Sequence, residues 1–231
     1  AIPPRTKALV VNSPNNPSGV VYSPETLQAM ADLLRRKAAE YGHPIYLISD
    51  EPYRELVFQG FTTPWIPNYY DDTLVCYSYS KSLSLPGERI GYILVGEKVA
   101  LRQEVYAAIC GAGRALGYVN APSLFQRVVA ECDGLTSDLA VYQTNRDLLY
   151  QGLTKMGYTC VEPGGTFYLF LKSPEPDANA FCKRAQAYDL LFPPADDFAC
   201  PGWCRIAFCT GTDKVERALP IFEKLAKEYG L

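Results

Sequence analysis

The sequence predicts an α/β protein whose first domain has a mostly parallel sheet with flanking helices, followed by a smaller C-terminal α+β domain. From Lys7 to Gly96, short and nearly continuous apolar runs are separated by helical or loop segments, which is typical of strands buried on both faces of a parallel sheet. A long helical pattern then precedes strands around a Pro-Gly-Gly turn and two further helices. We therefore expect one domain over residues 1–135 and a second over 136–231, which includes the long connecting helix.

The first domain is expected to contain strands that are apolar runs bounded by turn signals, at Lys7–Asn12, Ile45–Ser49, Thr73–Tyr77 and Ile90–Gly96. The helix after the first strand begins at Ser23, a hydroxyl cap, with proline next and an acid in the first turn. Apolar residues then recur at three- and four-residue steps as far as Tyr41. This pattern indicates a helix that packs on the sheet and carries no chemistry.

The remainder of the chain reads mainly as helices until the second domain. From Glu97 to about Cys132 the helical pattern is interrupted at Gly111-Ala112-Gly113 and at Asn120-Ala121-Pro122, where we expect breaks. The later elements are a helix, strands around the Pro163-Gly164-Gly165 turn, a helix, a strand and a closing helix, at Ser137–Met156, Cys160–Leu171, Asn179–Tyr188, Trp203–Cys209 and Lys214–Tyr229.

Composition excludes several functional classes. The chain has 231 residues, 48% hydrophobic and 20% charged, as in ordinary globular proteins, and its net charge of -3 gives no basic surface for nucleic acid. There is no apolar run long enough to span a membrane, and the first residues lack the apolar core of a signal peptide, so we expect a cytoplasmic protein without a membrane partner. Because the chain does not begin with Met and enters a strand within a few residues, we expect it to be a fragment or a processed chain.

The eight cysteines stand mostly in apolar segments without a C-x-x-C pair, as expected for core residues in a reducing compartment. Cys200, Cys204 and Cys209 are close in sequence, but the only histidine, His43, is far away. We expect no metal site.

The most informative stretch is Ser78-Tyr79-Ser80-Lys81, followed by Arg89. A lysine whose pKa is lowered can attack a carbonyl and form a Schiff base. The hydroxyls of Ser78 and Ser80 and the guanidinium of Arg89 could hold a phosphate beside it, and pyridoxal phosphate needs both functions. Taken alone, the stretch is also compatible with a solvated lysine in a polar loop.

Three other places carry polar residues where apolar strands end or run. Asn16 lies in the Pro- and Asn-rich loop after the first strand, and its bond to Pro17 could be cis. Asp50 and Tyr53 follow the second strand, where a carboxylate either caps a helix or meets a positive charge. Arg205 lies inside an apolar strand and needs an anion, either a substrate carboxylate or an internal acid. Ligands of open α/β sheets bind beyond the strand ends, where Asn16, Asp50, Tyr53 and Lys81 are expected to converge.

Five motifs in this order resemble those of the class I and II aminotransferases, which are fold-type I pyridoxal-phosphate enzymes. The resemblance covers essentially the whole chain. The family's N-P-[TS]-G, D-E-x-Y, S-x-S-K with a later arginine, and two C-terminal motifs are matched here by Asn16-Pro17-Ser18-Gly19, Asp50-Glu51-Pro52-Tyr53, Ser78-Tyr79-Ser80-Lys81 with Arg89, Pro163-Gly164-Gly165-Thr166-Phe167-Tyr168 and Cys204-Arg205-Ile206.

The resemblance implies a role for each of these positions in binding pyridoxal 5'-phosphate. Lys81 would form the internal aldimine and later move the proton between the substrate Cα and the cofactor. Asp50 would pair with the pyridinium nitrogen. The remaining cofactor ligands would be Tyr53 and Asn16 at the ring 3′-oxygen, and Ser78 and Arg89 at the phosphate.

The substrate α-carboxylate would be bound by Arg205 together with Asn16. The implied reaction is ping-pong transfer of an amino group between an amino acid and a 2-oxo acid, in a homodimer. The alternatives are a carbon-sulfur β-lyase or a decarboxylase on the same fold, or a non-catalytic regulatory domain, because the fold does not fix the reaction.

The chain departs from the family by lacking the N-terminal part of the large domain. In the family that part supplies a glycine-containing helix start at the phosphate, an aromatic that stacks on the ring, and further strands. The chain resembles the C-terminal half of the cofactor-binding domain, over 1–135, and the small domain. We therefore expect the gene product to be longer and this fragment alone to be inactive.

Overall fold

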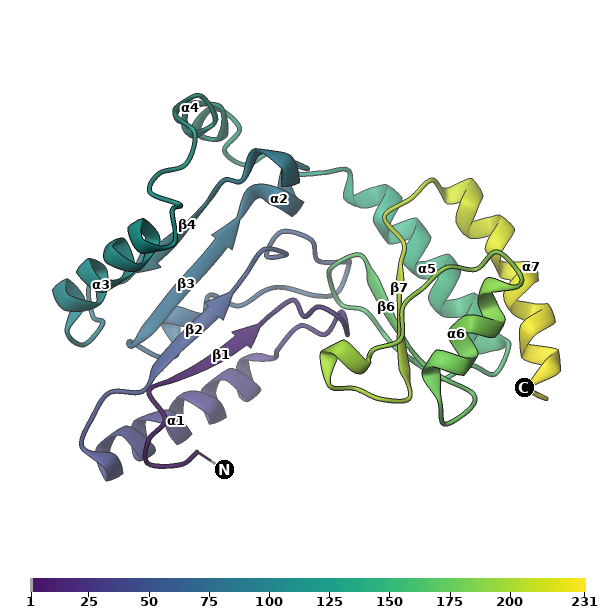
Figure 1. The fold of residues 1–231 in the computed structure, drawn as a ribbon, viewed down its shortest axis with the longest axis horizontal. Coiled ribbons are helices and arrows are strands. Elements are labelled where there is room, and N and C mark those ends of the chain that lie inside the picture. The colour runs from purple at the N-terminus through teal and green to yellow at the C-terminus, as the bar shows by residue number, and fades with distance from the viewer. Residues whose placement is uncertain (1) are drawn as a thin grey trace. The chain divides into compact units, whose positions relative to one another are not determined.

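A computed structural model describes residues 2–231, which form two compact units (Figure 1). Each unit is assembled from several segments of the chain. Unit 1 consists of the residues up to Ser13, Tyr22–Glu55 and Thr63–Ser137. Unit 2 consists of Pro14–Val21, Leu56–Thr62 and Asp138–Leu231.

Unit 1 is built on a four-stranded sheet in the order β1-β2-β3-β4. Its strands are β1 (Ala8–Asn12), β2 (Tyr46–Asp50), β3 (Thr73–Ser78) and β4 (Gly91–Val95). The first three are parallel, and β4 runs antiparallel to β3. This confirms the predicted α/β class with a mostly parallel sheet. The carboxyl ends of β1, β2 and β3 consequently lie at one edge, as the arrows in Figure 1 show.

Helix α1 (Pro24–Tyr41) lies against one face of this sheet (Figure 1). It begins as predicted, because the Ser23 side chain accepts a hydrogen bond from the amide of Thr26, and it ends at Gly42 with a left-handed φ of 70°. Its buried side chains pack with apolar strand residues in one core, made of Val11, Leu27, Ala31, Leu34, Ile45, Leu47, Ile66 and Tyr70. Burial of these side chains holds the strands in register.

The expectation that the outer strands are buried on both faces is wrong. Val10 of β1 is 65% exposed and Ile93 of β4 is 50% exposed. In β1 successive residues alternate between the two faces, and only Val11 is buried in the α1 core. In β4 the consecutive residues Tyr92, Ile93 and Leu94 are all exposed, so neither face of that strand is covered in the described residues. A continuous apolar run therefore did not mean two-sided burial here.

Two more helices follow β4 in unit 1. They are α3 (Arg102–Ala115) and α4 (Ser123–Glu131), and no residue in either is fully buried within the described structure. The expected break at Gly111-Ala112-Gly113 is wrong, because α3 runs through it; each glycine costs a helix only about 1 kcal/mol. The break at Asn120-Ala121-Pro122 is confirmed. The short elements are α2 (Tyr79–Ser82), η1 (Ile66–Asn68) and η2 (Pro86–Glu88).

Unit 2 contains a three-stranded antiparallel sheet in the order β5-β6-β7 and three helices. Its elements are α5 (Leu139–Lys155), β5 (Cys160–Val161), β6 (Tyr168–Lys172), α6 (Ala178–Gln186), η3 (Asp196–Phe198), β7 (Trp203–Ala207) and α7 (Thr212–Glu228). Phe181, Phe208 and Phe222 are fully buried in its core. Among residues 2–231, no helix is both long and apolar enough to cross a bilayer.

Candidate active site

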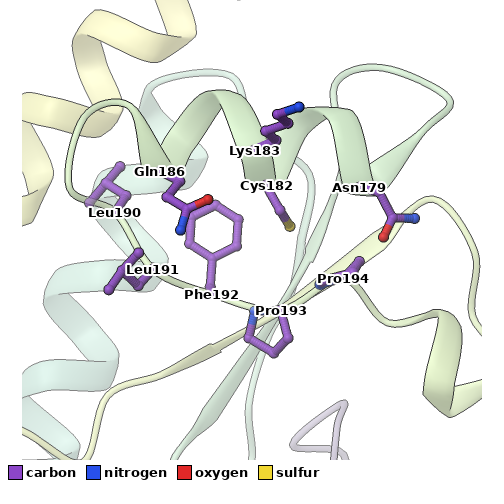
Figure 2. Close-up of a pocket in the computed structure, with 9 residues that line it drawn as sticks. All are labelled: Asn179, Cys182, Lys183, Gln186, Leu190, Leu191, Phe192, Pro193 and Pro194. Carbon is purple, nitrogen blue, oxygen red and sulfur yellow. The ribbon is translucent and has the colours of Figure 1, made fainter.

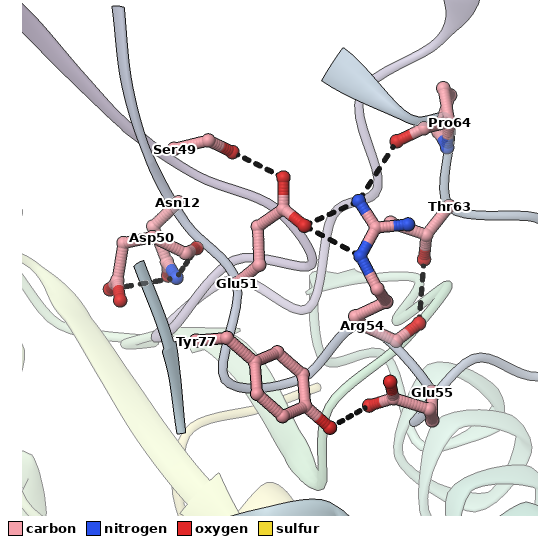
Figure 3. A network of polar contacts seen from close by, with 9 residues as sticks. All are labelled: Asn12, Ser49, Asp50, Glu51, Arg54, Glu55, Thr63, Pro64 and Tyr77. Carbon is pink, nitrogen blue, oxygen red and sulfur yellow. Dashed lines mark hydrogen bonds and ion pairs between the residues drawn. The ribbon is translucent and has the colours of Figure 1, made fainter. Parts of the chain in front are cut away.

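Asp50 and Asn12 are the last residues of adjacent parallel strands and stand opposite each other in the register. The side-chain Nδ2 of Asn12 donates to the Asp50 main-chain oxygen at 2.9 Å and to the Asp50 carboxylate at 3.2 Å (Figure 3). Burial raises the pKa of Asp50. Within unit 1 the carboxylate has no ion-pair partner. A half-buried carboxylate supported only by an amide is suited to receive a cation.

The neighbouring Glu51 has a different, structural environment. It is fully buried, accepts a hydrogen bond of 2.6 Å from the Ser49 hydroxyl, and is paired with the Arg54 guanidinium, whose Nε lies 2.6 Å away (Figure 3). Arg54 in turn lies over the Trp65 ring. The pair spans the turn after β2, because its two members stand on either side of Pro52 and Tyr53.

Lys81 lies in the single turn of α2, directly after β3. The Ser78 hydroxyl caps this turn by accepting from the Ser80 amide at 3.2 Å, and the Ser137 hydroxyl donates to the Lys81 carbonyl at 3.0 Å. The Lys81 ammonium nitrogen is 6.0 Å from the ring centroid of Tyr53, which is buried. The sheet edge therefore brings Lys81 and Tyr53 close together.

Ser78 and Arg89 are related through the pairing of β3 with β4. Ser78 stands opposite Gly91, and the Tyr79 amide donates to the Ile90 carbonyl at 3.1 Å. Arg89 is exposed, has a left-handed φ of 52° and donates to the Pro86 carbonyl at 2.9 Å. A side chain at Gly91 would collide with the Tyr77 carbonyl, so only glycine permits this register.

In unit 2, the loop that carries Asn16 packs against the Pro-Gly-Gly turn. The Asn16–Pro17 bond is cis. The amides of Gly164 and Gly165 donate to the Gly19 carbonyl at 2.9 and 3.0 Å. Gly19 has a φ of 72°, and a Cβ there would lie 2.7 Å from the Pro163 Cβ. Two motifs that are far apart in sequence are therefore neighbours in unit 2.

Arg205 of β7 is half-buried in unit 2 and points at Asn16, whose side-chain oxygen accepts from its guanidinium at 2.9 Å. The guanidinium carbon lies 4.4 Å from the Tyr168 ring centroid and 4.9 Å from that of Phe198. Its buried Nε has no hydrogen-bond partner in the described structure, and within unit 2 it has no carboxylate partner. An oriented guanidinium with a spare donor is suited to bind an anion.

The predicted site residues thus fall into two groups. Unit 1 contains Asp50, Tyr53, Ser78, Lys81 and Arg89, of which Lys81 and Tyr53 lie close together, and in unit 2 Arg205 donates to Asn16. No cluster of metal-ligand side chains occurs in residues 2–231.

Sequence reasoning missed Asn12, the Glu51–Arg54 pair and the two rings beside Arg205. Asn12 could have been found, because it is the only polar residue at the end of its strand and parallel strands end at the same edge. Glu51 was recognised only as part of a motif. The rings of Tyr168 and Phe198 come from separate elements, and no local signal connects them to Arg205.

The profile of the family "Aminotransferase class I and II" matches residues 1–220. The aspartate/prephenate aminotransferase of Thermus thermophilus is 33% identical over 231 residues, which cover 97% of this chain and 58% of that protein.

Solved structures agree with this match. An amino transferase from Eubacterium rectale has 55% identity and a TM-score of 0.96, covering 100% of this chain and 58% of that one. The aspartate aminotransferase of Thermotoga maritima has 28% identity and a TM-score of 0.84, covering 97% and 58%. The chain therefore spans about 58% of the length of these relatives.

Proposed function

Since this chain is a member of the class I and II aminotransferase family, we propose that its protein moves an amino group between an amino acid and a 2-oxo acid with pyridoxal 5'-phosphate as cofactor. The observation that carries this proposal is the Asp50 carboxylate, which lies at the end of a parallel strand without a cationic partner in unit 1. Its raised pKa reflects the cost of burying that charge. A protonated pyridine nitrogen is the partner that such a carboxylate lacks.

The residue types at these positions suit the groups of this cofactor. In our proposal Asp50 pairs with the ring nitrogen, Tyr53 donates to the ring oxygen, Ser78 and Arg89 bind the phosphate, and Lys81 provides the amine. When bound, pyridoxal phosphate supplies a carbonyl carbon that reacts with amines and a ring that withdraws electrons from the substrate α-carbon. Unit 1 then represents part of the cofactor-binding domain and unit 2 the small domain.

Lys81 acts in this proposal as the general base and acid that removes the proton from the substrate Cα and returns it. Its position depends on the capped turn of α2, in which Ser78 and Ser137 fix both ends of a very short helix. Asp50 keeps a proton on the ring nitrogen, and Asn12 in turn holds the carboxylate of Asp50 in place.

The substrate α-carboxylate is assigned to Arg205. A guanidinium matches a carboxylate with parallel hydrogen bonds, and the rings of Tyr168 and Phe198 fix its plane. The Asn16 side-chain oxygen accepts a hydrogen bond from one guanidinium nitrogen of Arg205, so that the remaining N–H donors are oriented before substrate binds. We also propose a homodimer, on the family resemblance alone.

The test uses the protein expressed from its complete reading frame. We expect purified protein to be yellow, and borohydride reduction to attach the cofactor covalently to the peptide that contains Lys81. Lys81→Ala should abolish the attachment and lower turnover by at least about 10²-fold. Lys98→Ala is the matched control, because Lys98 is an exposed lysine in a surface ion pair with Asp71.

Unchanged attachment in Lys81→Ala would contradict the assignment of the lysine. Product analysis tests the reaction separately. Release of ammonia and pyruvate from a cysteine-like donor, without amination of any 2-oxo acid, would replace the aminotransferase with a lyase on the same fold.

A further inference from the structure

We propose that Cys182 and Cys204 form a reversible thiol–disulfide site in unit 2, which low-molecular-weight disulfides reach through the cavity beside α6. Cys182 lies on α6 and Cys204 on β7, and their sulfur atoms are 3.5 Å apart. A disulfide bond is about 2.05 Å long. The two sulfurs therefore need to approach by only a small side-chain movement. This site lies outside the residues proposed for amino transfer.

The cavity gives one of the two thiols access to solvent. It has a volume of about 610 Å³ and is lined by Cys182 together with Lys183, Asn179, Gln186 and apolar residues of the following segment. Figure 2 shows the Cys182 sulfur directed from α6 toward the chain at Pro193 and Pro194. Polar and cationic groups at the rim suit a small peptide disulfide that carries carboxylates.

The second thiol, that of Cys204, lies behind the cavity lining at Pro193 and Pro194. Cys204 is fully buried. The backbone of β7 pairs with the cavity wall on both sides of it, because Pro194 bridges to Cys204 and the Arg205 amide donates to the Pro193 carbonyl at 3.1 Å. Cys204 has no exposed surface and does not line the cavity, whereas its sulfur contacts that of Cys182, so in our proposal Cys182 reacts first.

The pKa shifts of the two thiols support the same order, with Cys182 reacting first and Cys204 second. The contact with the Cys204 thiol lowers the pKa of Cys182 against the opposing effects of burial and of Asp196 and Asp177. The contact with Cys182, and then burial, raise the pKa of Cys204. Lys183 is the cationic side chain beside Cys182 at the cavity. The accessible thiol is thus the better nucleophile, since the thiolate is the reactive form.

With glutathione disulfide as oxidant, the reaction balances in two exchanges. The Cys182 thiolate attacks one sulfur of glutathione disulfide, forms a mixed disulfide and releases one glutathione thiolate. Cys204 then loses its proton to solvent or to that thiolate and attacks the Cys182 sulfur, which expels the second glutathione. The protein is oxidised by two electrons and one glutathione disulfide is reduced to two glutathiones.

The experiment treats the full-length protein with glutathione disulfide, blocks remaining thiols with N-ethylmaleimide at low pH, and maps non-reduced peptides by mass spectrometry. We expect a cross-linked pair of peptides containing Cys182 and Cys204 that dithiothreitol separates. The cross-link should form about tenfold faster than glutathione adds to Cys160, because burial raises the pKa of that thiol to about 12.

Matched variants separate the two steps. Cys182→Ser should lose the cross-link and leave Cys204 unmodified, whereas Cys204→Ala should retain glutathione on Cys182 as a stable mixed disulfide. Cys209→Ser, which removes an exposed cysteine of the same unit, should leave the cross-link unchanged. If Cys204→Ala does not fold, the wild type and Cys182→Ser alone decide the question. Wild-type protein that carries glutathione at Cys182 without any cross-link, or that leaves Cys182 unmodified, would overturn the proposal.

Discussion

The Arg205 guanidinium donates a 2.9 Å hydrogen bond to the side-chain oxygen of Asn16, 189 positions earlier in the chain. The acceptor is a neutral amide, so it orients the guanidinium without neutralising it. Two aromatic rings restrict the same group from its faces. The positive charge of Arg205 is therefore oriented and still available to an external anion.

Replacing this arginine with lysine tests whether substrate binding needs the paired N–H donors of the guanidinium. Arg205→Lys retains the charge but loses the parallel donors, so we expect kcat/KM for the amino-acid substrate to fall about 10- to 100-fold, mainly through KM. Steady-state kinetics of the full-length enzyme measure this. Arg217→Lys, at an exposed ion pair of α7, should be neutral. Equal kinetics for Arg205→Lys and wild type would remove Arg205 from substrate binding.

The Asp50 carboxylate should make stability depend on pH in the cofactor-free protein. Because burial raises its folded-state pKa, the native state binds more protons than the unfolded state in the window above about pH 4. The contribution of Asp50 to the free energy of unfolding is thus fully present below that window and is lost as the pH rises through the folded-state pKa.

The isosteric variant Asp50→Asn removes that titration. We expect the cofactor-free variant to be at least as stable as wild type at pH 7, with the difference shrinking toward pH 4, as measured by urea unfolding across pH. With cofactor present the variant should bind it more weakly. A variant that is less stable than wild type at pH 7 and equally pH-dependent would show that the charge of Asp50 is already compensated.

Glu51 is expected to matter for folding rather than chemistry. Glu51→Ala leaves Ser49 and Arg54 without their shared acceptor, and breaking a buried ion pair costs about 3–5 kcal/mol, with the lower end expected because Arg54 is partly exposed. Urea unfolding measures the loss. Asp32→Ala, which breaks the exposed pair with Arg35, should cost about 0–1 kcal/mol. Similar losses in the two variants would argue against a special role for the buried pair.

Gly91→Ala tests the close approach of β4 to β3. The added methyl group meets the Tyr77 carbonyl, so strand pairing next to Ser78 must shift, at a cost of about 1–3 kcal/mol. Thermal and urea unfolding measure it. At Gly87 an added Cβ has open space, and Gly87→Ala should change stability little. Unimpaired stability in Gly91→Ala would mean that the strands can adjust without strain.

The sequence was sufficient to predict the order of strands and helices along the chain and the loops after β1, β2 and β3. Turn residues and hydroxyl caps act locally, so these features can be predicted from short stretches of sequence. It was insufficient for burial. Apolar runs at β1 and β4 indicated two covered faces, yet Val10 and Ile93 are exposed. The sequence of a strand shows which of its side chains can be buried. Whether other elements cover them depends on the tertiary structure.

The same distinction applies to the candidate site. The positions of Lys81 and Asp50 could be predicted, because Asp50 ends the apolar strand β2 and Lys81 lies in the turn that follows β3. Their roles stay predictions. Asn12 could also have been inferred from its place at the end of the adjacent strand, and Arg54 from its position three residues after Glu51. The rings of Tyr168 and Phe198 could not, because no spacing in sequence connects them to Arg205. Cys182 and Cys204 likewise lie in separate elements, and no spacing in sequence connects them.

The interleaving of the two units has a consequence for synthesis. Gly19 belongs to unit 2, yet the amides that bind its carbonyl, at Gly164 and Gly165, are translated much later. During translation the Asn16 loop is therefore made before its hydrogen-bond partners, and it lacks them while most of unit 1 is synthesised. Cleavage after Ser137, which is one of five points where the chain passes between the units, would accordingly not release unit 2 intact, because its first two segments would remain on the other fragment.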